Sequence, residues 1–500
     1  MASTLLHSPQ QAAQWLRARV RGQLHADSRQ VRAGDGFIAW PGAATDGRRF
    51  VAAALAQGAS ACLVEHEGAQ AFDIDRPEVA TYAHLKADTG AIAAAFYAAP
   101  SQALQVVAVT GTNGKTSTAW WLSWALSKIK LSALSPCALV GTLGIGLPSD
   151  MQATGMTTPD PVLLQQRLRA MVDAGVRSCA IEASSIGIAE RRLEGMAIRV
   201  AVFTNFTQDH LDYHGSMEAY WQAKAALFDW PGLQAAVLEI DDPRGESLRA
   251  QARARGLDIW TVARRHEARL RATDIVYGER GLQWMVREGQ QALPIRTALV
   301  GEYNIANLMC VLGALRALGV PLPDAVAVCA DLPAVPGRME HIGGPGLPLA
   351  VVDYAHTPDA IDKVLHALRP LAAQRGGRLW CVLGCGGNRD ATKRPLMAAA
   401  AEVGADRLVL TSDNPRHEEP QAIIDAMRTG LRQGQAATVE VDRAQAIAHA
   451  LAEAQAADVV LIAGKGHEDY QEVRGQRTPF SDQAIARQAL ERRAARRMLP

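Results

Sequence analysis

The segment with the most distinctive chemistry is a glycine-rich turn that ends in a lysine and a threonine, Thr110-Gly-Thr-Asn-Gly-Lys-Thr-Ser117. Two glycines let backbone amides face phosphate oxygens, and a helix that begins at such a turn adds positive potential. Lys115 would reach the β- and γ-phosphates, and Thr116 would offer its hydroxyl to Mg²⁺. Only two residues separate the glycines, so the turn is shorter than the usual phosphate loop. We predict that a nucleoside triphosphate binds to Gly111, Thr112, Asn113, Gly114, Lys115, Thr116 and Ser117.

Three further groups suit chemistry at a phosphate. Glu182 ends an apolar run, where a carboxylate could hold Mg²⁺ beside the phosphates. His210 lies in a turn rich in aspartate and histidine, although a histidine there also fits a structural or surface role. Lys224 lies in the mostly apolar segment 220–228, where a lysine could also extend its ammonium to solvent. These residues alone do not separate a ligase from another class of ATPase.

A second candidate site lies near the C-terminus, in Asp413-Asn-Pro-Arg416 and Gly464-Lys-Gly-His-Glu468. The guanidinium of Arg416 can bind a carboxylate with two parallel hydrogen bonds, and Asp413 or Glu468 can accept from an ammonium. Arg389 could add a second positive contact, and Gly464 would allow close approach of backbone. Asp, Asn and Pro also favour turns, so the first segment fits a plain turn before a helix as well. These two segments therefore offer groups for both a carboxylate and an ammonium.

Length and composition limit the class of protein. A chain of 500 residues suggests about three domains. Lysine plus arginine exceed aspartate plus glutamate by 52 − 51 = 1, which gives no bias toward nucleic acid or membrane. No apolar run approaches the roughly 20 residues of a membrane span, and the N-terminus does not resemble a signal peptide. Seven scattered cysteines argue against a disulfide framework, and we interpret Cys381 and Cys385 as core thiols. We expect a cytoplasmic monomer that binds neither nucleic acid nor membrane.

The pattern of elements predicts an α/β protein of three domains. Residues 1–100 would form a small N-terminal α/β domain, residues 101–335 a central phosphate-loop α/β domain with a parallel sheet, and residues 336–500 a Rossmann-like C-terminal α/β domain. Alternating polarity over 273–286 predicts a β-hairpin. The basic stretch 491–497 fits a nucleic-acid patch or, better, the solvated end of a helix. The predicted strands are 36–40, 61–64, 104–110, 179–182, 200–204, 235–240, 349–353, 379–383, 407–411 and 459–463, and the predicted helices are 85–97 and 116–128.

This series of motifs resembles the Mur ligases and folylpolyglutamate synthetases. Besides the phosphate loop, Glu182 and Lys224, the matching segments are Asn205…Asp209-His210-Leu-Asp212, Gly301-Glu-Tyr-Asn304-Ile-Ala-Asn307, Pro336-Gly-Arg338-Met-Glu340, Asp353-Tyr-Ala-His356-Thr-Pro-Asp359, Asp413-Asn-Pro-Arg416 and Gly464-Lys-Gly-His-Glu468. The resemblance extends from about Asp27 to Asp482, and it is greatest to the diaminopimelate-adding members of the Mur ligase family.

The resemblance implies an ATP-dependent amide ligase of peptidoglycan synthesis. Such an enzyme adds meso-2,6-diaminopimelate to the D-glutamate of UDP-N-acetylmuramoyl-L-Ala-D-Glu through an acyl phosphate. The implied catalytic residues are Lys115, Glu182, His210 and Lys224. The implied Mg²⁺ ligands are Thr116, Glu182, His210 and Lys224, the last as a CO₂-derived carbamate. Carbamylation requires a neutral amine, which an apolar pocket favours by lowering the pKa of a lysine.

The resemblance also assigns substrate contacts. Asn304, Asn307, Arg338 and Asp353 would close on ATP, with a hinge near Pro336-Gly337, although Asn304 also fits a helix N-cap. The contacts to the UDP-muramoyl-dipeptide would be Ser28, Thr157, Thr158, Ser184, Glu190 and Arg192, and those to diaminopimelate Arg389, Asp413, Asn414, Pro415, Arg416, Gly464 and Glu468. The chain departs from a related enzyme at Glu190 (glutamine there), Ile186 (histidine) and Ala43-Ala44 (His-Gln).

Several alternatives stay open. A lysine-adding ligase lacks a distal substrate carboxylate, so Arg416 disfavours it, and the separate N-terminal domain disfavours a folylpolyglutamate synthetase. A phosphate-loop ATPase coupled to motion or transport would need an arginine activated by a partner or a surface that docks on a membrane, and the sequence indicates neither. A non-catalytic ATP-binding module conflicts with the intact set of Lys115, Glu182 and His210.

Overall fold

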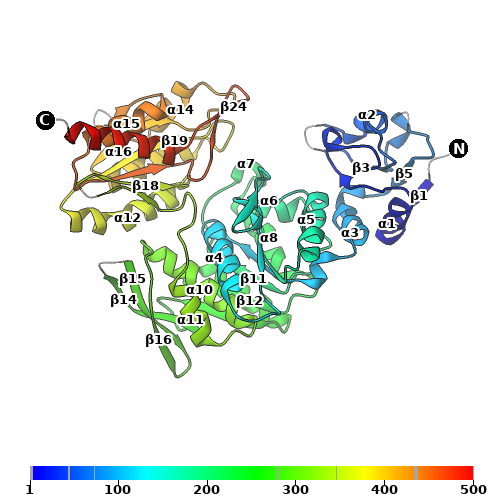
Figure 1. The fold of residues 1–500 in the computed structure, drawn as a ribbon, viewed down its shortest axis with the longest axis horizontal. Coiled ribbons are helices and arrows are strands. Elements are labelled where there is room, and N and C mark those ends of the chain that lie inside the picture. The colour runs from blue at the N-terminus through cyan, green and yellow to red at the C-terminus, as the bar shows by residue number, and fades with distance from the viewer. Residues whose placement is uncertain are drawn as a thin grey trace.

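The computed structural model describes residues 4–42, 45–72, 74–278, 281–344, 346–432 and 437–498. These residues form three lobes, each built on its own sheet, with the first and third lobes at opposite ends of the molecule (Figure 1). A two-stranded ribbon adds a fourth, small sheet. Each large sheet falls within one of the three predicted domain ranges. The predicted fold class, an α/β protein of three domains with parallel sheets, is confirmed.

The N-terminal lobe is a parallel sheet in the order β1-β5-β4-β3-β2. Helices α1 and α3 pack on one face of the sheet and α2 on the other. The sequence predicted only β3 and β4, because the remaining strands are short or weakly apolar. The elements are β1 (Thr4–Leu6), α1 (Pro9–Arg17), β2 (Leu24–His25), β3 (Gly36–Ala39), α2 (Val51–Ala56), β4 (Ala61–Glu65), β5 (Val79–Tyr82) and α3 (Leu85–Phe96).

The central lobe contains eleven strands in the order β16-β15-β14-β13-β12-β11-β6-β10-β7-β8-β9. The strands from β7 to β14 pair in parallel, whereas both edges of the sheet are antiparallel. The hairpin predicted at 273–286 is formed by β14 and β15 and extends the main sheet. The strands are β6 (Gln105–Thr110), β7 (Cys137–Gly141), β8 (Gly144–Leu147), β9 (Asp150–Gln152), β10 (Ser178–Glu182), β11 (Val200–Phe203), β12 (Ala235–Glu239), β13 (Asp258–Ala263), β14 (Leu270–Gly278), β15 (Gly281–Glu288) and β16 (Gln291–Arg296).

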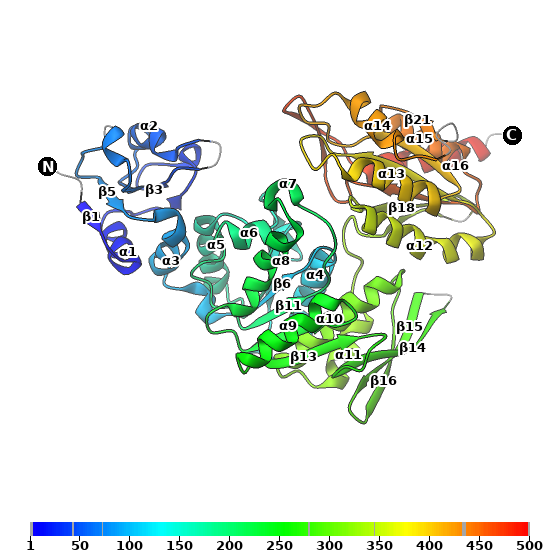
Figure 2. The same ribbon diagram turned by 180° about the vertical axis from the view of Figure 1, so that it is seen from behind.

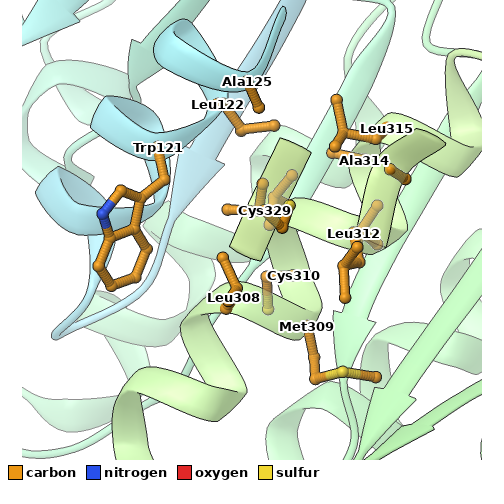
Figure 3. Close-up of a cluster of buried hydrophobic side chains, with 14 of the residues drawn as sticks. Trp121, Leu122, Ala125, Leu308, Met309, Cys310, Leu312, Ala314, Leu315 and Cys329 are labelled. Atoms are coloured by element: carbon orange, nitrogen blue, oxygen red, sulfur yellow. The ribbon is translucent and has the colours of Figure 1, made fainter. Parts of the chain in front are cut away.

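Two layers of helices cover the central sheet. Alternate residues of each strand face opposite layers, so both faces are apolar. On one face α4, α10 and α11 pack together, with Trp121, Leu312 and Cys329 in the shared core (Figure 3). On the other face lie α5, α8 and α9. The helices are α4 (Lys115–Lys128), α5 (Pro161–Asp173), α6 (Ser185–Ala189), α7 (Leu211–His214), α8 (Met217–Ala225), α9 (Pro243–Ala254), α10 (Glu302–Ala317) and α11 (Leu322–Ala330).

The C-terminal lobe has six strands in the order β17-β18-β22-β19-β20-β21, and all pairs except β17–β18 are parallel. Helices α12, α13 and α14 cover one face, and α15 and α16 cover the other (Figure 2). The sequence predicted the four central strands and missed the short edge strands. The elements are β17 (Glu340–Ile342), β18 (Leu349–Asp353), α12 (Pro358–Arg375), β19 (Leu379–Cys385), α13 (Lys393–Gly404), β20 (Arg407–Ser412), α14 (Pro420–Arg428), β21 (Thr438–Val439), α15 (Arg443–Glu453), β22 (Val459–Ala463), β23 (Tyr470–Val473), β24 (Gln476–Pro479) and α16 (Asp482–Met498).

The cysteines, the basic stretch 491–497 and the lengths of the helices bear on three further predictions. All seven cysteines are free and buried, as predicted for Cys381 and Cys385. The basic stretch 491–497 belongs to α16, so its interpretation as part of a helix is confirmed. No helix within the described ranges is both long and apolar enough to cross a membrane.

Candidate active site

The phosphate loop joins β6 to α4 at the carboxyl end of the central sheet. Gly111 and Gly114 have φ values of 148° and 83°, which favour glycine. A Cβ atom on Gly111 would lie 2.0 Å from Thr204 Oγ1, and one on Gly114 would lie 2.2 Å from Asn307 Oδ1. Both glycines are therefore required by backbone conformation and by close packing against β11 and α10.

Lys115 is the first residue of α4, and its amine is folded back onto the loop. Its Nζ donates to the carbonyl oxygens of Gly111 at 2.9 Å and Thr112 at 2.8 Å. Burial lowers the pKa of Lys115, while Glu182 and Asp209 oppose this effect. The amine thus lies inside the loop that would surround a phosphate.

Glu182 lies at the end of β10, beside the first turn of α4. Its Oε2 accepts from Thr116 Oγ1 at 2.9 Å, and its Oε1 accepts from the backbone amide of Thr142 at 2.8 Å. The side chain is fully buried, which raises the pKa of the carboxyl group, whereas Lys115 lowers it. A hydroxyl and a carboxylate in contact are oxygen donors of the kind that Mg²⁺ prefers, with phosphate and water oxygens completing its shell.

His210 is the residue before α7 and has a left-handed backbone with φ of 51°. Burial lowers the pKa of His210 to about 3, although Asp209 opposes the shift. The imidazole is therefore neutral at pH 7, which is the form that binds metals. Among the described residues, no three His, Cys, Asp or Glu side chains form a cluster that could hold a metal ion. A Mg²⁺ site here would consequently need Thr116, the modified Lys224 and substrate oxygens as well.

Lys224, in α8, is 1% exposed, so the alternative that its ammonium extends to solvent is wrong. Its Nζ donates to the carbonyl of Gly111 at 2.7 Å and lies 4.4 Å from the centroid of the Tyr220 ring. Burial, with Lys115 nearby, moves the pKa of Lys224 well below its ordinary value. Burial of Lys224 thus favours the neutral amine, which is the form that a carbamate requires.

Residues of the C-terminal lobe contact the phosphate loop. Arg338 Nη2 donates to Thr116 Oγ1 at 3.3 Å, and the guanidinium lies 4.2 Å from the centroid of the Tyr354 ring. Asp353 accepts from the backbone amides of Met339 and Ala355, both at 2.8 Å. Asp353 therefore fixes the backbone that carries Arg338.

Asn304 and Asn307 lie together in the first turns of α10 and are almost buried. The N-cap of this helix is Gly301, so the alternative that Asn304 is the cap is wrong. Asn304 Nδ2 instead donates to the Val300 carbonyl at 2.9 Å, and its Oδ1 accepts from Asn307 Nδ2 at 3.3 Å. Contact between Asn307 and Gly114 would bring both amides to the nucleotide side of the loop.

Sequence reasoning missed three residues of the C-terminal lobe that reach the same place. Lys393 Nζ pairs with Asp209 Oδ1 at 2.7 Å, and Asp359 Oδ2 accepts from Asn113 Nδ2 at 3.1 Å. His356 interacts electrostatically with both Asp209 and Lys393. His356 and Asp359 belong to a motif quoted above, which was the available signal, whereas nothing in the local sequence marked Lys393.

The residues predicted to hold the muramoyl-dipeptide gather at the end of β10. Thr158 Oγ1 lies 2.9 Å from Ser184 Oγ, and Arg192 Nη1 donates to the Thr158 carbonyl at 2.9 Å. Thr157 Oγ1 lies 3.1 Å from Thr142 Oγ1. These side chains form one polar cluster next to Glu182.

Glu190 contacts the N-terminal lobe rather than this cluster. Its Oε2 pairs with Lys86 of α3 at 2.7 Å, its Oε1 accepts from the hydroxyl of Tyr213, and the bond to Lys86 lowers the pKa of Glu190. Ser28 lies in the N-terminal lobe, in a short turn capped by Asp27. Ala43 and Ala44 lie outside the described residues, and Ile186 is part of α6.

The residues predicted to bind the amino acid lie on three loops of the C-terminal lobe. Arg416 has φ of 52° and donates through Nη1 to the Gly387 carbonyl at 2.7 Å. A Cβ atom on Gly386 would lie 3.0 Å from Arg416 Nη1 and 3.8 Å from Arg389 Cγ, so the two arginines are neighbours. One on Gly464 would lie 2.4 Å from Asp413 Oδ2. The loops that follow β19, β20 and β22 therefore meet.

Beneath these loops lies a buried polar network. Lys465 is fully buried and donates to Asn414 Oδ1 at 3.0 Å and Glu468 Oε2 at 3.1 Å. Asn414 Nδ2 also donates to Glu468 Oε2, at 2.7 Å, and Pro415 packs beside it as a buried residue. Burial raises the pKa of Glu468, and Asp413 contributes in the same direction. The network fixes the position of the Glu468 carboxylate.

Comparison with known protein families shows which family has this arrangement of domains. Three family descriptions match in chain order: "Mur ligase family, catalytic domain" over residues 23–97, "Mur ligase middle domain" over 109–315 and "Mur ligase, glutamate ligase domain" over 337–466. The chain belongs to the Mur ligase family. The resemblance that the motifs indicated is thereby confirmed, and the candidate active site lies where the middle and glutamate ligase domains of this Mur ligase meet.

Individual members of the family match this chain over nearly its whole length. The UDP-N-acetylmuramoyl-L-alanyl-D-glutamate–2,6-diaminopimelate ligase of Acidovorax sp. is 60% identical over 487 residues, which is 97% of both chains. The enzyme of the same name from Janthinobacterium sp. is 46% identical over 495 residues, 96% of both chains. A solved structure with that name has a TM-score of 0.65 at 36% identity and covers 94% of this chain and 95% of its own.

Proposed function

We propose that the protein is an ATP-dependent ligase that joins meso-2,6-diaminopimelate to the D-glutamate of UDP-N-acetylmuramoyl-L-Ala-D-Glu. The relatives that carry the corresponding name support this proposal, because they match the chain almost end to end. The observation that carries it is the convergence of Lys115, Glu182 and the buried Lys224 on one loop that the C-terminal lobe also contacts. In this proposal the reaction is a cytoplasmic step of peptidoglycan synthesis and the enzyme is a monomer.

Each lobe has one task in this proposal. Residues 1–100 bind the UDP-sugar, residues 101–335 bind ATP and the acceptor carboxylate, and residues 336–500 bind the amino acid. ATP would occupy the loop 111–117, with Asn304 and Asn307 beside the adenine and Arg338 closing from the C-terminal lobe. When ATP binds, the γ-phosphate would accept from the Lys115 amine in place of the two carbonyl groups to which this amine now donates.

The first chemical step transfers the γ-phosphoryl group to the acceptor carboxylate. A carboxylate oxygen forms a bond to phosphorus, the bond to the leaving oxygen of ADP breaks, and an acyl phosphate results. The amine of the second substrate then attacks the acyl carbon, and phosphate leaves as the amide forms and the amine loses a proton. Both steps bring anions together, and Lys115 and Arg338 lie where cations can offset this charge.

Thr116, Glu182, His210 and Lys224 would hold Mg²⁺, the last as its carbamate. The ion would offset phosphate charge and polarise the transferred phosphoryl group. The buried amine of Lys224 would attack the carbon of CO₂ and lose one proton, which leaves an anionic carbamate. Such a change would add a carboxylate beside the phosphate loop, where no three described His, Cys, Asp or Glu side chains form a cluster that could hold a metal ion.

The amino-acid pocket favours diaminopimelate over lysine. Diaminopimelate carries a carboxylate and an ammonium at its distal centre, whereas lysine carries only the ammonium there. The guanidinium of Arg416, with Arg389 beside it, matches a carboxylate, and Asp413 or Glu468 matches the ammonium. The dipeptide substrate would contact Ser28, Thr157, Thr158, Ser184 and Arg192. Glu190 could accept from the dipeptide as well, since its two contacts to Lys86 and Tyr213 use only one acceptor position on each oxygen.

Phosphate release from ATP, with each substrate in turn omitted, tests the proposal. We expect release only when the muramoyl-dipeptide and diaminopimelate are both present. Release from ATP alone would contradict it and favour a phosphate-loop ATPase of another class. A competition between diaminopimelate and lysine then tests the amino-acid specificity, and equal incorporation of lysine would contradict that part.

A further inference from the structure

The C-terminal lobe contains an ion pair that is completely excluded from solvent and contacts the strands that lead into the candidate amino-acid-binding loops. Arg443, the first residue of α15, and Asp482, the first residue of α16, both have side chains with 0% exposure. Arg443 Nε donates to Asp482 Oδ1 at 2.8 Å, and Nη2 donates to Oδ2 at 2.7 Å. Burial alone would lower the pKa of Arg443, but attraction to Asp482 raises it above its usual range. The pair is therefore charged and bidentate.

The same guanidinium also binds two strand ends. Nη2 donates to the carbonyl of Ala463 at 3.0 Å, and Nη1 donates to the carbonyl of Ser412 at 3.3 Å. Ala463 is the last residue of β22 and precedes Gly464, and Ser412 is the last residue of β20 and precedes Asp413. Arg443 thus contacts the final residue before each of the two loops that carry the candidate amino-acid contacts.

These two strands have no direct hydrogen bonds to each other. The order β22-β19-β20 places β19 between them, so their axes lie about 9–10 Å apart, at about 4.8 Å per strand spacing. Ser412 and Ala463 both still pair with β19, and beyond them the loops are joined by side chains, since Lys465 donates to Asn414 and Asn414 donates to Glu468. Arg443 adds a second link at the base of the loops, because one planar guanidinium donates to both strand-end carbonyls. The tight approach of Gly464 to Asp413 Oδ2 shows that the loops have little room to shift.

We propose that Arg443 and Asp482 are positioning residues that hold the loops after β20 and β22 at a fixed separation and thereby set the affinity for the amino-acid substrate. This inference rests on the proposed function, because it assumes that these loops bind the amino acid. Asp482 aims the guanidinium, and Arg443 fixes the two strand ends. Lysine cannot replace Arg443, since an ammonium lacks the planar fork that binds a carboxylate and two carbonyls together.

Kinetics of three variants test the inference. In Arg443→Lys we expect KM for diaminopimelate to rise by about tenfold to a hundredfold, since small misplacements of binding groups have effects of this size. KM for ATP should stay at the wild-type value. As a control, Arg369→Lys alters an ion pair to Asp406, which lies before β20 at the opposite end of the strand, and should leave all KM values unchanged.

The double variant Arg443→Met/Asp482→Leu separates positioning from stability. Replacing a whole buried ion pair by apolar side chains is often neutral or stabilising, whereas removal of one partner leaves a buried charge. We expect the double variant to melt near the wild-type temperature and still to show the raised KM for diaminopimelate. A wild-type KM in the double variant would overturn the inference, because the pair would then serve stability alone.

Failure of the proposed function has a different signature. If the unmodified protein releases phosphate without any dependence on diaminopimelate, the proposed function fails and the inference fails with it. If the unmodified protein requires diaminopimelate and the double variant has an unchanged KM, only the inference is overturned.

Discussion

At the scale of single residues, burial decides the protonation state of the groups around the phosphate loop. Burial strongly lowers the pKa of Lys224, and partial burial beside other cationic groups lowers the pKa of His210 to about 3. Neither state can be read from residue type. The consequences differ, because a neutral lysine can be modified, whereas a neutral histidine can bind a metal ion.

Lys224→Ala tests whether a carbamate on Lys224 is required for activity. We expect kcat to fall by about 100-fold or more, as for loss of a group that stabilises transition-state charge, with partial recovery on addition of bicarbonate. Mass spectrometry of the native protein should find one CO₂ added at Lys224. Lys128→Ala, at an exposed lysine paired with Asp331, is the control and should keep full activity. Full activity of Lys224→Ala without bicarbonate would contradict the role.

His210 makes a specific contribution to the pH dependence of stability. Its pKa is about 3 in the folded protein and near 6.5 when unfolded, so the unfolded state binds the proton first as the pH falls. Above pH 6.5 the group contributes nothing. Between pH 6.5 and pH 5 it should destabilise the fold, by less than the full pKa shift implies, because the side chain is 38% exposed and solvent screens its charge. In His210→Gln we expect that part of the loss between pH 7 and pH 5 to disappear, as measured by denaturant unfolding. Identical pH profiles of the two proteins would show that the expected shift is absent.

Arg416→Lys tests whether Arg416 binds the distal carboxylate of diaminopimelate. A planar fork is replaced by a point charge, so we expect KM for diaminopimelate to rise by about tenfold or more, in line with loss of 1.4 kcal/mol or more of binding. KM for ATP should not change. An unchanged KM for the amino acid would remove Arg416 from the pocket.

At the scale of elements, each loop follows the carboxyl end of a parallel strand, and glycines set how closely the loops approach one another. Gly114, at the N-cap of α4, combines a left-handed φ with contact to Asn307 of α10. The turn between β6 and α4 therefore depends on a helix that lies almost two hundred residues further along the chain.

A pair of glycine variants separates backbone strain from this contact. Gly319 has φ of 86°, close to the 83° of Gly114, but nothing lies within 4 Å of its missing Cβ. We expect Gly319→Ala to lower the free energy of unfolding by about 1–2 kcal/mol and leave KM for ATP unchanged. Gly114→Ala should cost more stability and also raise KM for ATP. Equal effects of the two substitutions would show that the contact with Asn307 is unimportant.

At the scale of the whole molecule, the candidate active site is made of residues from two lobes that meet. Lys393 and Asp359 of the C-terminal lobe contact Asp209 and Asn113 of the central lobe, and Arg338 contacts Thr116. Lys393 and Asp209 are nearly buried, so their pair links the lobes at the edge of the phosphate loop.

Lys393→Met tests this link. Because the substitution removes a cation from the interface and leaves Asp209 unpaired, we expect kcat to fall by about 100-fold. Binding of ATP, measured by calorimetry, should change far less, since the phosphate loop itself is intact. Arg369→Met, at a half-exposed ion pair of the same lobe, is the matched control. An equal loss of ATP affinity and kcat would argue that Lys393 serves only to hold ATP.

Local patterns were enough to predict the family, the order of the three lobes, the glycine-rich turn at Lys115 and many of the buried strands, because glycines, apolar runs and turn residues are visible in short segments. Two interior strands of the central sheet, β7 and β13, were not predicted. The strands β2 and β21 were missed because each has only two residues, which is too few to show the alternation of apolar and polar side chains that marks a strand. The three-dimensional fold was needed to show that Lys224 is buried, that Lys393 pairs with Asp209, that Glu190 pairs with Lys86, and that Arg443 joins two strand ends. Such contacts join residues far apart in the chain, and burial and distance between them follow from how the sheets and lobes pack.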